Sequence, residues 1–234
     1  MTKYQWFYAD WLIPMSTIRS MMLSYQFTEE GREGFLLSRS GKTFIEGKFI
    51  RKNEYMIFQE MPLGGHEEIQ KIDYSIASFR LSCDKKTGLE IIDPPRTIRP
   101  FISKMSEMIG LGMVVSEHFI DPLLWVQEIE KRSDKVWVTE MQGSGIRVSN
   151  SSIAKFLIRG ELDVREDWKS LVQGKQYSLN GVKLKVKKKD VREESFVVEL
   201  KGSGSARFFD DNHTLVYEIV RDGFVSLQNN RLKN

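Results

Sequence analysis

Hydrophobic and polar residues alternate in short runs through residues 16–93, and turn residues separate the runs. The runs are TIRSMMLSYQF, GFLLSRSGKTFIEGKFI, EYMIFQEM, SIASFRLSC and GLEIID. Alternation with a period of two is typical of strands that bury one face. The loop DKKTG, which contains Gly88, has a suitable length for a hairpin between the last two runs. This part of the chain therefore predicts an antiparallel sheet.

Two later segments have the apolar spacing of a helix. The first, PFISKMSEMIGLG, starts at Pro100 and ends in glycines, with apolar residues three and four positions apart. The second covers residues 121–131, where Asp121 is placed to cap the helix and Pro122 to occupy its first turn. Both segments predict helices that follow the sheet.

The remaining third of the chain mixes both patterns. The segment SNSSIAKFLIRGELDVREDWKSLVQGK opens with capping residues and pauses at Gly160, which predicts one broken helix or two short ones. From Tyr177 on, YSLNGVKLKVKKKD, SFVVELKG, SARFFDD, TLVYEIV and GFVSLQ predict a β-meander. The expected fold class is α+β, with a β-rich N-terminal domain over residues 1–112. Residues 113–234 would form a C-terminal domain with two helical segments and an antiparallel meander.

Two copies of a Glu-x-(Lys/Gln)-Gly-Ser-Gly motif stand at Glu140–Gly145 and Glu199–Gly204. A phosphate-binding loop would run from such glycines directly into a helix, and the flanking residues alternate as strands instead. The motifs match neither the P-loop nor the dinucleotide-binding pattern, so they predict no cofactor. We expect each to be a turn between antiparallel strands, with at least one glycine at positive φ.

The second motif also permits a nuclease interpretation. Glu199 and Lys201 lie two residues apart, so they share one face of a strand. Glu199 could then coordinate a divalent metal while Lys201 stabilises the transition state, with Asp190 as the second carboxylate. No helix pattern follows the strand as such a site requires. The nuclease is therefore the alternative, and a non-catalytic protein is the favoured interpretation.

Positive charge is concentrated near the C-terminal end, although the whole chain carries only +3. Residues 174–207 hold nine basic and four acidic residues. In VKLKVKKK the lysines alternate with Val182, Leu184 and Val186, so one face of the strand would be core and the other a row of lysines. Such a row either protects a sheet edge or contacts phosphates. The expected nucleic-acid-binding residues are Lys183, Lys185, Lys187, Lys188, Lys189, Arg192, Lys201 and Arg207.

The cysteine, the histidines and the apolar segments give little indication of a further function. Cys83 is the single cysteine and is expected in the core, while the three histidines lie far apart, so no metal site is predicted. No run approaches the roughly 18 apolar residues of a membrane span, and no signal peptide is recognisable, which favours a cytoplasmic protein. The N-terminal aromatic residues predict a strand tied into the core, an interface with a second copy or another protein, or a stacking platform. They are Tyr4, Trp6, Phe7, Tyr8 and Trp11.

The order of the elements, with the hairpin SFRLSCDKKTGLEIIDPPRT before a helix and a basic α+β half after it, resembles the layout of the RexA family of phage exclusion proteins. The resemblance is one of layout, so it transfers no site residues. It implies a link to a mobile element or to phage defence. Together with the lysine row, it favours a DNA-binding or other nucleic-acid-binding protein that acts as an oligomer or in a complex.

Overall fold

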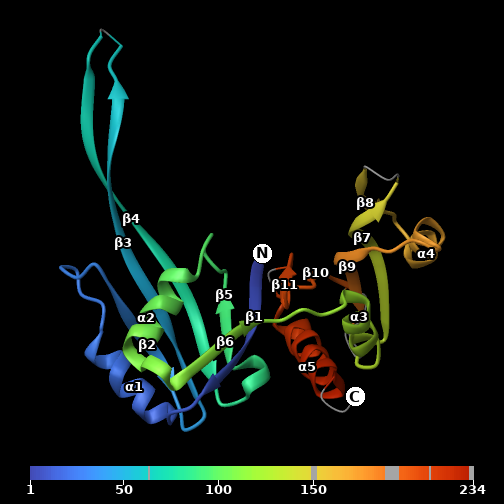
Figure 1. Ribbon diagram of the computed structural model, residues 1–234, viewed down its shortest axis with the longest axis horizontal. Helices are drawn as coiled ribbons and strands as arrows, with labels where there is room; N and C mark the ends of the chain where they lie inside the picture. The colour runs from blue at the N-terminus through green and yellow to red at the C-terminus, as the bar shows by residue number, and fades with distance from the viewer. Residues whose placement is uncertain (63, 149–151, 188–194, 211, 232–234) are drawn as a thin grey trace. The chain divides into compact units, whose positions relative to one another are not determined.

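The computed structural model describes residues 1–62, 64–148, 152–187, 195–210 and 212–231 (Figure 1). The fold is α+β and rich in strands, as the sequence predicts. Contacts within the chain define an N-terminal unit, Tyr8–Val115, and a C-terminal unit, in which Met1–Phe7 joins Ser116–Asn234. The strand β1 (Thr2–Trp11) contributes residues to both units. The first seven residues pack with the C-terminal half, although they were expected in the N-terminal domain.

The N-terminal unit contains an antiparallel sheet in the order β2-β3-β4-β5, continuing to β1. Phe35, Phe49, Phe79 and Phe101 contact one another on one face of this sheet and form the centre of the core. The elements are α1 (Met15–Ser24), β2 (Glu33–Ser40), β3 (Phe44–Glu60), β4 (His66–Ser82), the 3-10 turn Lys85–Thr87, β5 (Leu89–Ile92), α2 (Arg99–Ile109), the 3-10 turn Gly110–Gly112 and β6 (Met113–Glu117).

The pairing of strands β3 and β4 continues far past the points where the neighbouring strands β2 and β5 end. They are in register from Phe44 opposite Ser82 to Glu60 opposite His66. Strand β2 pairs with β3 only as far as Arg51, and β5 pairs with β4 only as far as Ser78. The outer parts, residues 52–60 and 66–77, therefore form a two-stranded ribbon that projects from this unit (Figure 1). We call this ribbon the β3–β4 arm.

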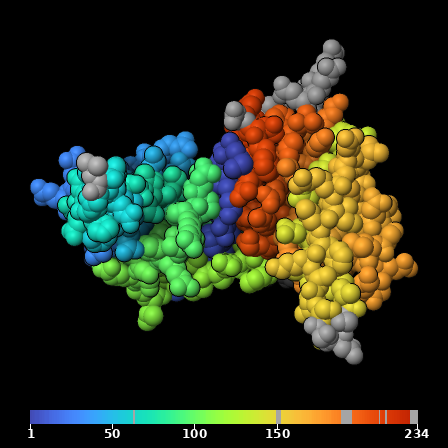
Figure 2. Space-filling model, turned by 90° about the horizontal axis from the view of Figure 1, so that it is seen from above, coloured from blue at the N-terminus to red at the C-terminus, as the bar shows by residue number. Residues whose placement is uncertain are grey.

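The C-terminal unit has the strand order β1-β11-β10-β9-β7-β8. Figure 2 shows the N-terminal residues, in blue, lying against the red C-terminal part of the chain. One face of this sheet is buried under helices α3, α4 and α5. The elements are α3 (Pro122–Glu130), β7 (Lys135–Arg147), β8 (Ile153–Arg159), α4 (Arg165–Val172), β9 (Ser178–Lys187), β10 (Ser195–Lys201), β11 (Ser205–Phe208) and α5 (Thr214–Arg231).

Several sequence expectations are confirmed. The hairpin between β4 and β5, the helix α2 and the helix α3 all form where they were predicted. Asp121 caps α3 by accepting a hydrogen bond from the backbone N–H of Leu123 at 2.8 Å. The strands β9, β10 and β11 form the predicted meander. Among the helices of the described residues, none is long and apolar enough to span a membrane.

Three segments predicted as strands are helical in the structure. The segment predicted as a strand at residues 17–27 is mostly α1, where Met15, Ile18 and Met22 are buried at spacings of three and four. The segments TLVYEIV and GFVSLQ form one helix, α5. Its buried residues Val216, Val220, Phe224 and Leu227 follow the same helical spacing. Packing against the sheet outweighs the strand preference of the β-branched residues.

Two further expectations are corrected: part of a predicted helix is a strand, and a residue expected in the core is exposed. The first half of the predicted broken helix is the strand β8, paired with β7, whereas its second half is the helix α4 as expected. Cys83 follows the end of β4 at Ser82 and is exposed. It is therefore not the core residue that was expected.

Candidate nucleic-acid interface

A row of charged side chains crosses six strands of the C-terminal sheet. The pairing places Lys3 of β1 opposite Arg207 of β11, and Arg207 opposite Glu199 of β10. Glu199 lies opposite Lys183 of β9, which lies opposite Glu140 of β7, which lies opposite Arg159 of β8. Residues directly opposite each other in paired strands project from the same face. We call this set the charged row.

The neighbouring rows make this face strongly positive. Lys185 is opposite Trp137, and Lys187 is opposite Lys135, on the strands β9 and β7. Helices α3, α4 and α5 pack on the other face, against Val182, Leu184 and Val186. The lysine row therefore projects away from the helices, as the alternation in the sequence predicts. We define the basic face as Lys3, Lys135, Arg159, Lys183, Lys185, Lys187, Lys201 and Arg207 with Glu140 and Glu199.

The two carboxylates of the basic face are paired with cations. Glu199 lies 3.3 Å from the Lys201 Nζ and 3.5 Å from the Arg207 Nη1. Glu140 accepts hydrogen bonds from Arg159 at 2.7 Å. Lys183 has its Nζ 4.2 Å from the centre of the Phe209 ring. With Glu161, which lines a hollow beside Lys185 and Lys187, this surface carries eight cations and three carboxylates, a local excess of five positive charges.

Burial, and after it the neighbouring cations, lower the pKa of Lys3 at one end of the charged row. Partial burial lowers the pKa of Lys3, and the nearby charges of Lys201 and Arg207 lower it further. Glu199 opposes this shift, but it does not cancel it. A bound anion would offset the effect of Lys201 and Arg207 on the pKa of Lys3, because a negative charge favours the charged ammonium. This end of the charged row is therefore suited to bind an anion.

An aromatic ring lies among the lysines at the other end of the basic face. A hollow of about 430 Å³ is lined by Trp137, Glu161, Lys185, Lys187 and Ser195. The Lys135 Nζ lies 4.5 Å from the centre of the Trp137 ring, in a cation–π contact. A flat ring surrounded by cations can stack a nucleobase while the lysines contact its phosphates.

The residues of the nuclease alternative are only partly brought together. Glu199 and Lys201 share a face of β10, but the Glu199 carboxylate is occupied by two ion pairs. The other carboxylate of the charged row, Glu140, lies two strands away, about 10 Å at the usual strand spacing, with Lys183 between. Asp190 lies outside the described residues. Lys188, Lys189 and Arg192 of the predicted binding residues lie outside them as well.

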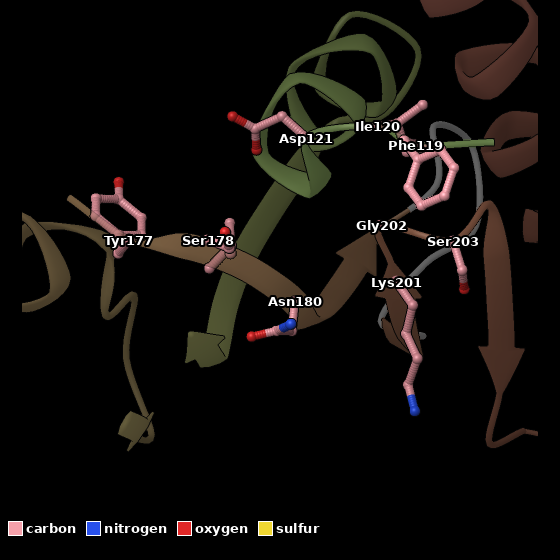
Figure 3. A pocket seen from close by; sticks show the side chains of 10 residues that line it. Phe119, Ile120, Asp121, Tyr177, Ser178, Asn180, Lys201, Gly202 and Ser203 are labelled. Atoms are coloured by element: carbon pink, nitrogen blue, oxygen red, sulfur yellow. The ribbon is translucent and has the colours of Figure 1, made fainter. Parts of the chain in front are cut away.

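A second hollow lies at the end of the sheet where β9 begins and β10 ends (Figure 3). It has a volume of about 810 Å³. Asp121 and Lys201 point away from each other in it, and Asp121 caps α3. Much of its wall is backbone, because Ile120 N–H donates to Gly202 O and Gly202 N–H donates to Asn180 O. This hollow has no paired acid and base, so the basic face is the stronger candidate.

The two Gly-Ser-Gly motifs have different structural roles. Gly202–Gly204 is the expected turn between β10 and β11, with Gly204 at φ +73°. The first motif is not a turn, which corrects the prediction. It lies inside β7 at a bulge between Gly143 and Ile146, with Gly145 at φ +80°. Gly143 faces Trp168 so closely that a Cβ would lie 2.4 Å from the ring. Neither motif leads into a helix.

The aromatic N-terminus packs inside the chain. Trp6 and Phe7 are buried, and Trp6 contacts Trp125 and Phe224. Trp11 donates to the carbonyls of Ser82 and Gly88 at 3.1 Å. Of the three interpretations, a strand tied into the core is the one that the structure bears out. Among the described residues, no three or more His, Cys, Asp or Glu side chains are grouped as metal ligands.

Sequence reasoning missed several members of the basic face. Lys3, Arg159 and Lys135 are far from the lysine row in sequence and reach it only through strand pairing. Trp137 could have been found, because it alternates with the apolar Val136 and Val138 in VWVTE. That alternation places it on the outward face of its strand. No protein-family model and no curated protein matches this chain.

Proposed function

We propose that this protein is a non-catalytic nucleic-acid-binding protein and that the basic face is its binding surface. The observation that carries the proposal is the alignment of cations from six strands on the face of the sheet opposite the helices. A chain whose net charge is only +3 places an excess of five charges on this one surface. Such local concentration is the electrostatic signature of phosphate binding.

The lysine row supports contact with a linear polyanion. Lys183, Lys185 and Lys187 follow one another along β9 at about 6.6–6.8 Å, twice the rise of a strand residue. Within the described part of the chain, none of the three forms an ion pair, whereas Glu140 and Glu199 are both paired. The carboxylates therefore offer little competition with phosphates for these lysines.

Trp137 supports a single-stranded ligand. A base can stack on a protein ring only when it is unpaired or turned out of a duplex, and base stacking contributes about 1–3 kcal/mol per base. The Trp137 ring lies beside Lys135, Lys185 and Lys187, and Glu161 lines the same hollow. We therefore propose single-stranded DNA or RNA as the ligand class. The layout resemblance to the RexA family extends the proposal to nucleic acid of a phage or another mobile element.

The test is a salt titration of nucleic-acid binding. Each phosphate contact with a single strand contributes about 0.7 to the slope of log affinity against log salt. Replacing Lys183, Lys185 and Lys187 with glutamine should therefore reduce the slope by about 2 and weaken binding to all sequences alike. Fluorescence anisotropy with labelled single-stranded and double-stranded DNA and RNA of mixed sequence measures this directly.

A matched control shows whether the salt slope depends on the lysines of the basic face or only on the net charge of the chain. The exposed lysines Lys42, Lys169 and Lys175 can be replaced with glutamine in a second triple variant, which loses the same net charge. This variant should keep the salt slope of the wild type. An equal loss in both variants would refute a specific surface, and no binding by the wild type at 50 mM salt would refute the function. Replacing Trp137 with alanine should weaken single-stranded binding and leave duplex binding unchanged.

A further inference from the structure

The β3–β4 arm exposes large apolar side chains on both faces. The face that continues the outer side of the sheet carries a stripe of five apolar residues. These are Met56, Phe58, Ile72, Tyr74 and Ile76, which are 45–66% exposed. Tyr55, Ile57 and Ile69 are exposed on the opposite face. An isolated two-stranded ribbon is marginally stable in water, and a contiguous apolar surface of this kind marks an interaction site.

The arm is also polarised in charge along its length. Lys48, Arg51 and Lys52 stand at its base. From the pair Glu54 and Ile72 outward, residues 54–72 contain four glutamates and a single lysine, Lys71. The apolar stripe lies between the basic base and the acidic tip. A partner that fits this surface needs an apolar centre with the opposite order of charges at its two ends.

A second copy of the same arm, turned end for end, has this order. Strand pairing places Lys52, Glu54, Tyr74 and Ile72 on one face, at the middle of the stripe. When two such faces pack antiparallel about the level of Asn53 and Asp73, Tyr74 lies over Ile72 of the second copy and Lys52 over its Glu54. The same packing places Phe58 over Lys48 of the second copy, so that Glu68, which is opposite Phe58, lies diagonally across from that lysine. The surface is thus self-complementary, as a two-fold interface requires.

We propose that the β3–β4 arm is a dimerisation element and that two copies of this chain pack their arms antiparallel through this stripe. Nucleic acid is not the expected ligand of the arm, because Glu60, Glu67 and Glu68 at its outer end would repel phosphates. The N-terminal aromatic residues are an unsuitable interface, since Trp6 and Phe7 are buried. An interface of one ribbon face is at the small end of stable interfaces, so we expect a dimer that depends on concentration.

The first experiment measures the oligomeric state by analytical ultracentrifugation between about 1 and 100 μM. The wild type should shift from monomer to dimer over this range. Replacing Met56, Phe58 and Ile72 with threonine should abolish the dimer, because threonine keeps strand propensity and removes the apolar surface. Replacing Tyr55, Ile57 and Ile69 on the opposite face with threonine is the matched control, and it should leave the dimer intact.

A cross-linking experiment tests the geometry. Exposed Cys83 is first replaced with serine, and a single cysteine is then introduced by Ile72→Cys or Ile69→Cys. Packed sheet faces lie about 10 Å apart, so a bismaleimide of that reach should link two Ile72→Cys chains and not two Ile69→Cys chains. Charge reversal adds a third check: Lys48→Glu and Glu68→Lys should each weaken the dimer, and together should restore it.

Three results would overturn the proposal. The first is a wild type that stays monomeric at 100 μM. The second is a dimer that survives the Met56, Phe58 and Ile72 substitutions. The third is a stripe variant that loses nucleic-acid binding without any wild-type dimer, which would make the arm a nucleic-acid contact. Circular dichroism should show that all variants remain folded, because the substituted side chains lie outside the hydrophobic core.

Discussion

Glu199 lies directly opposite Arg207 across β10 and β11, with 3.5 Å between the carboxylate and the guanidinium. The same carboxylate is 3.3 Å from Lys201. A carboxylate in this position would weaken binding in a nucleic-acid-binding protein, whereas it would be required for activity in a nuclease. It neutralises two cations in a binding surface, and it would be an essential metal ligand in a nuclease.

Replacing Glu199 with glutamine therefore separates the two functions. For a binding surface we expect the affinity for single-stranded nucleic acid at 50 mM salt to rise about threefold to tenfold, because Lys201 and Arg207 lose a competing charge. The gain should shrink at 500 mM salt, where charges are screened. Unchanged or weaker binding, together with the loss of a Mg²⁺-dependent cleavage activity of the wild type, would instead support the nuclease.

The lowered pKa of Lys3 predicts how binding depends on pH. An ordinary lysine keeps its charge up to about pH 10.4, and Lys3 loses its charge at a lower pH because of burial and of Lys201 and Arg207. As pH rises through this lowered pKa, the free protein loses one cation and the affinity should fall. Binding of a polyanion in that range should be accompanied by proton uptake, since the anion raises the pKa of Lys3.

The control is Lys3→Arg, because arginine stays charged throughout this range. The variant should lack the first decrease in affinity on the alkaline side, while the later decrease from the other lysines remains. Isothermal titration calorimetry in buffers of different ionisation enthalpy measures the proton uptake. Identical pH profiles for the wild type and the variant would show that Lys3 does not contact the ligand.

Asp163 links β7 to the start of α4. Its carboxyl group should make the free energy of unfolding depend on pH in the acidic range. Burial opposes its ionisation, but hydrogen bonds from the Arg165 side chain and from the backbone N–H groups of Arg165 and Val138 outweigh burial and lower its pKa. A carboxyl group with a lowered folded-state pKa stabilises the fold above its unfolded pKa of about 3.9. This stabilisation is lost as pH falls through the lower folded-state pKa.

Replacing Asp163 with asparagine should cost about 1–2 kcal/mol of the free energy of unfolding at pH 7. The difference from wild type should shrink as pH falls below about 4, where the wild-type carboxyl becomes protonated. Urea denaturation at several pH values checks both statements. Glu166→Gln is the comparison, because its ion pair with Lys169 is exposed and should contribute no measurable stability. A pH-independent loss in Asp163→Asn would show that the charge is not the cause.

The bulge in β7 predicts a specific packing constraint. A Cβ on Gly143 would lie 2.4 Å from the Trp168 Cη2, inside the core. Gly143→Ala should therefore cost about 1–3 kcal/mol of stability through overpacking. In a Trp168→Phe background the clashing atoms are absent, so the cost of Gly143→Ala should fall, which a double-mutant cycle from urea denaturation measures.

Gly145→Ala is the contrast for this prediction. Gly145 has φ +80° and meets only the Ser178 N at 4.0 Å. Its cost should be about 1–2 kcal/mol from backbone strain alone, and it should be the same with Trp or Phe at position 168. An equal response of both glycines to Trp168→Phe would contradict the distinction between packing and strain.

The sequence alone determined the features that depend on local periodicity. Alternation in VKLKVKK placed Lys183, Lys185 and Lys187 on one face, because strand side chains alternate irrespective of what the strand pairs with. The helix α3 was predictable from Asp121 and Pro122, since the capping hydrogen bond and the fixed proline φ act within one turn. The expectation of an α+β fold followed from these local signals.

Only the tertiary structure decided that residues 214–231 form a helix. Their β-branched residues and the Asp222-Gly223 pair favoured two strands and a turn, yet Val216, Val220 and Phe224 gain more by packing against α3 and the sheet. Gly223 permits this approach, because a Cβ there would lie 3.2 Å from the Ile129 side chain. Strand pairing likewise aligned Lys3 with Arg207 and Glu140 with Arg159. Register between distant strands depends on which faces are buried together, and a local pattern carries no information about the partner strand.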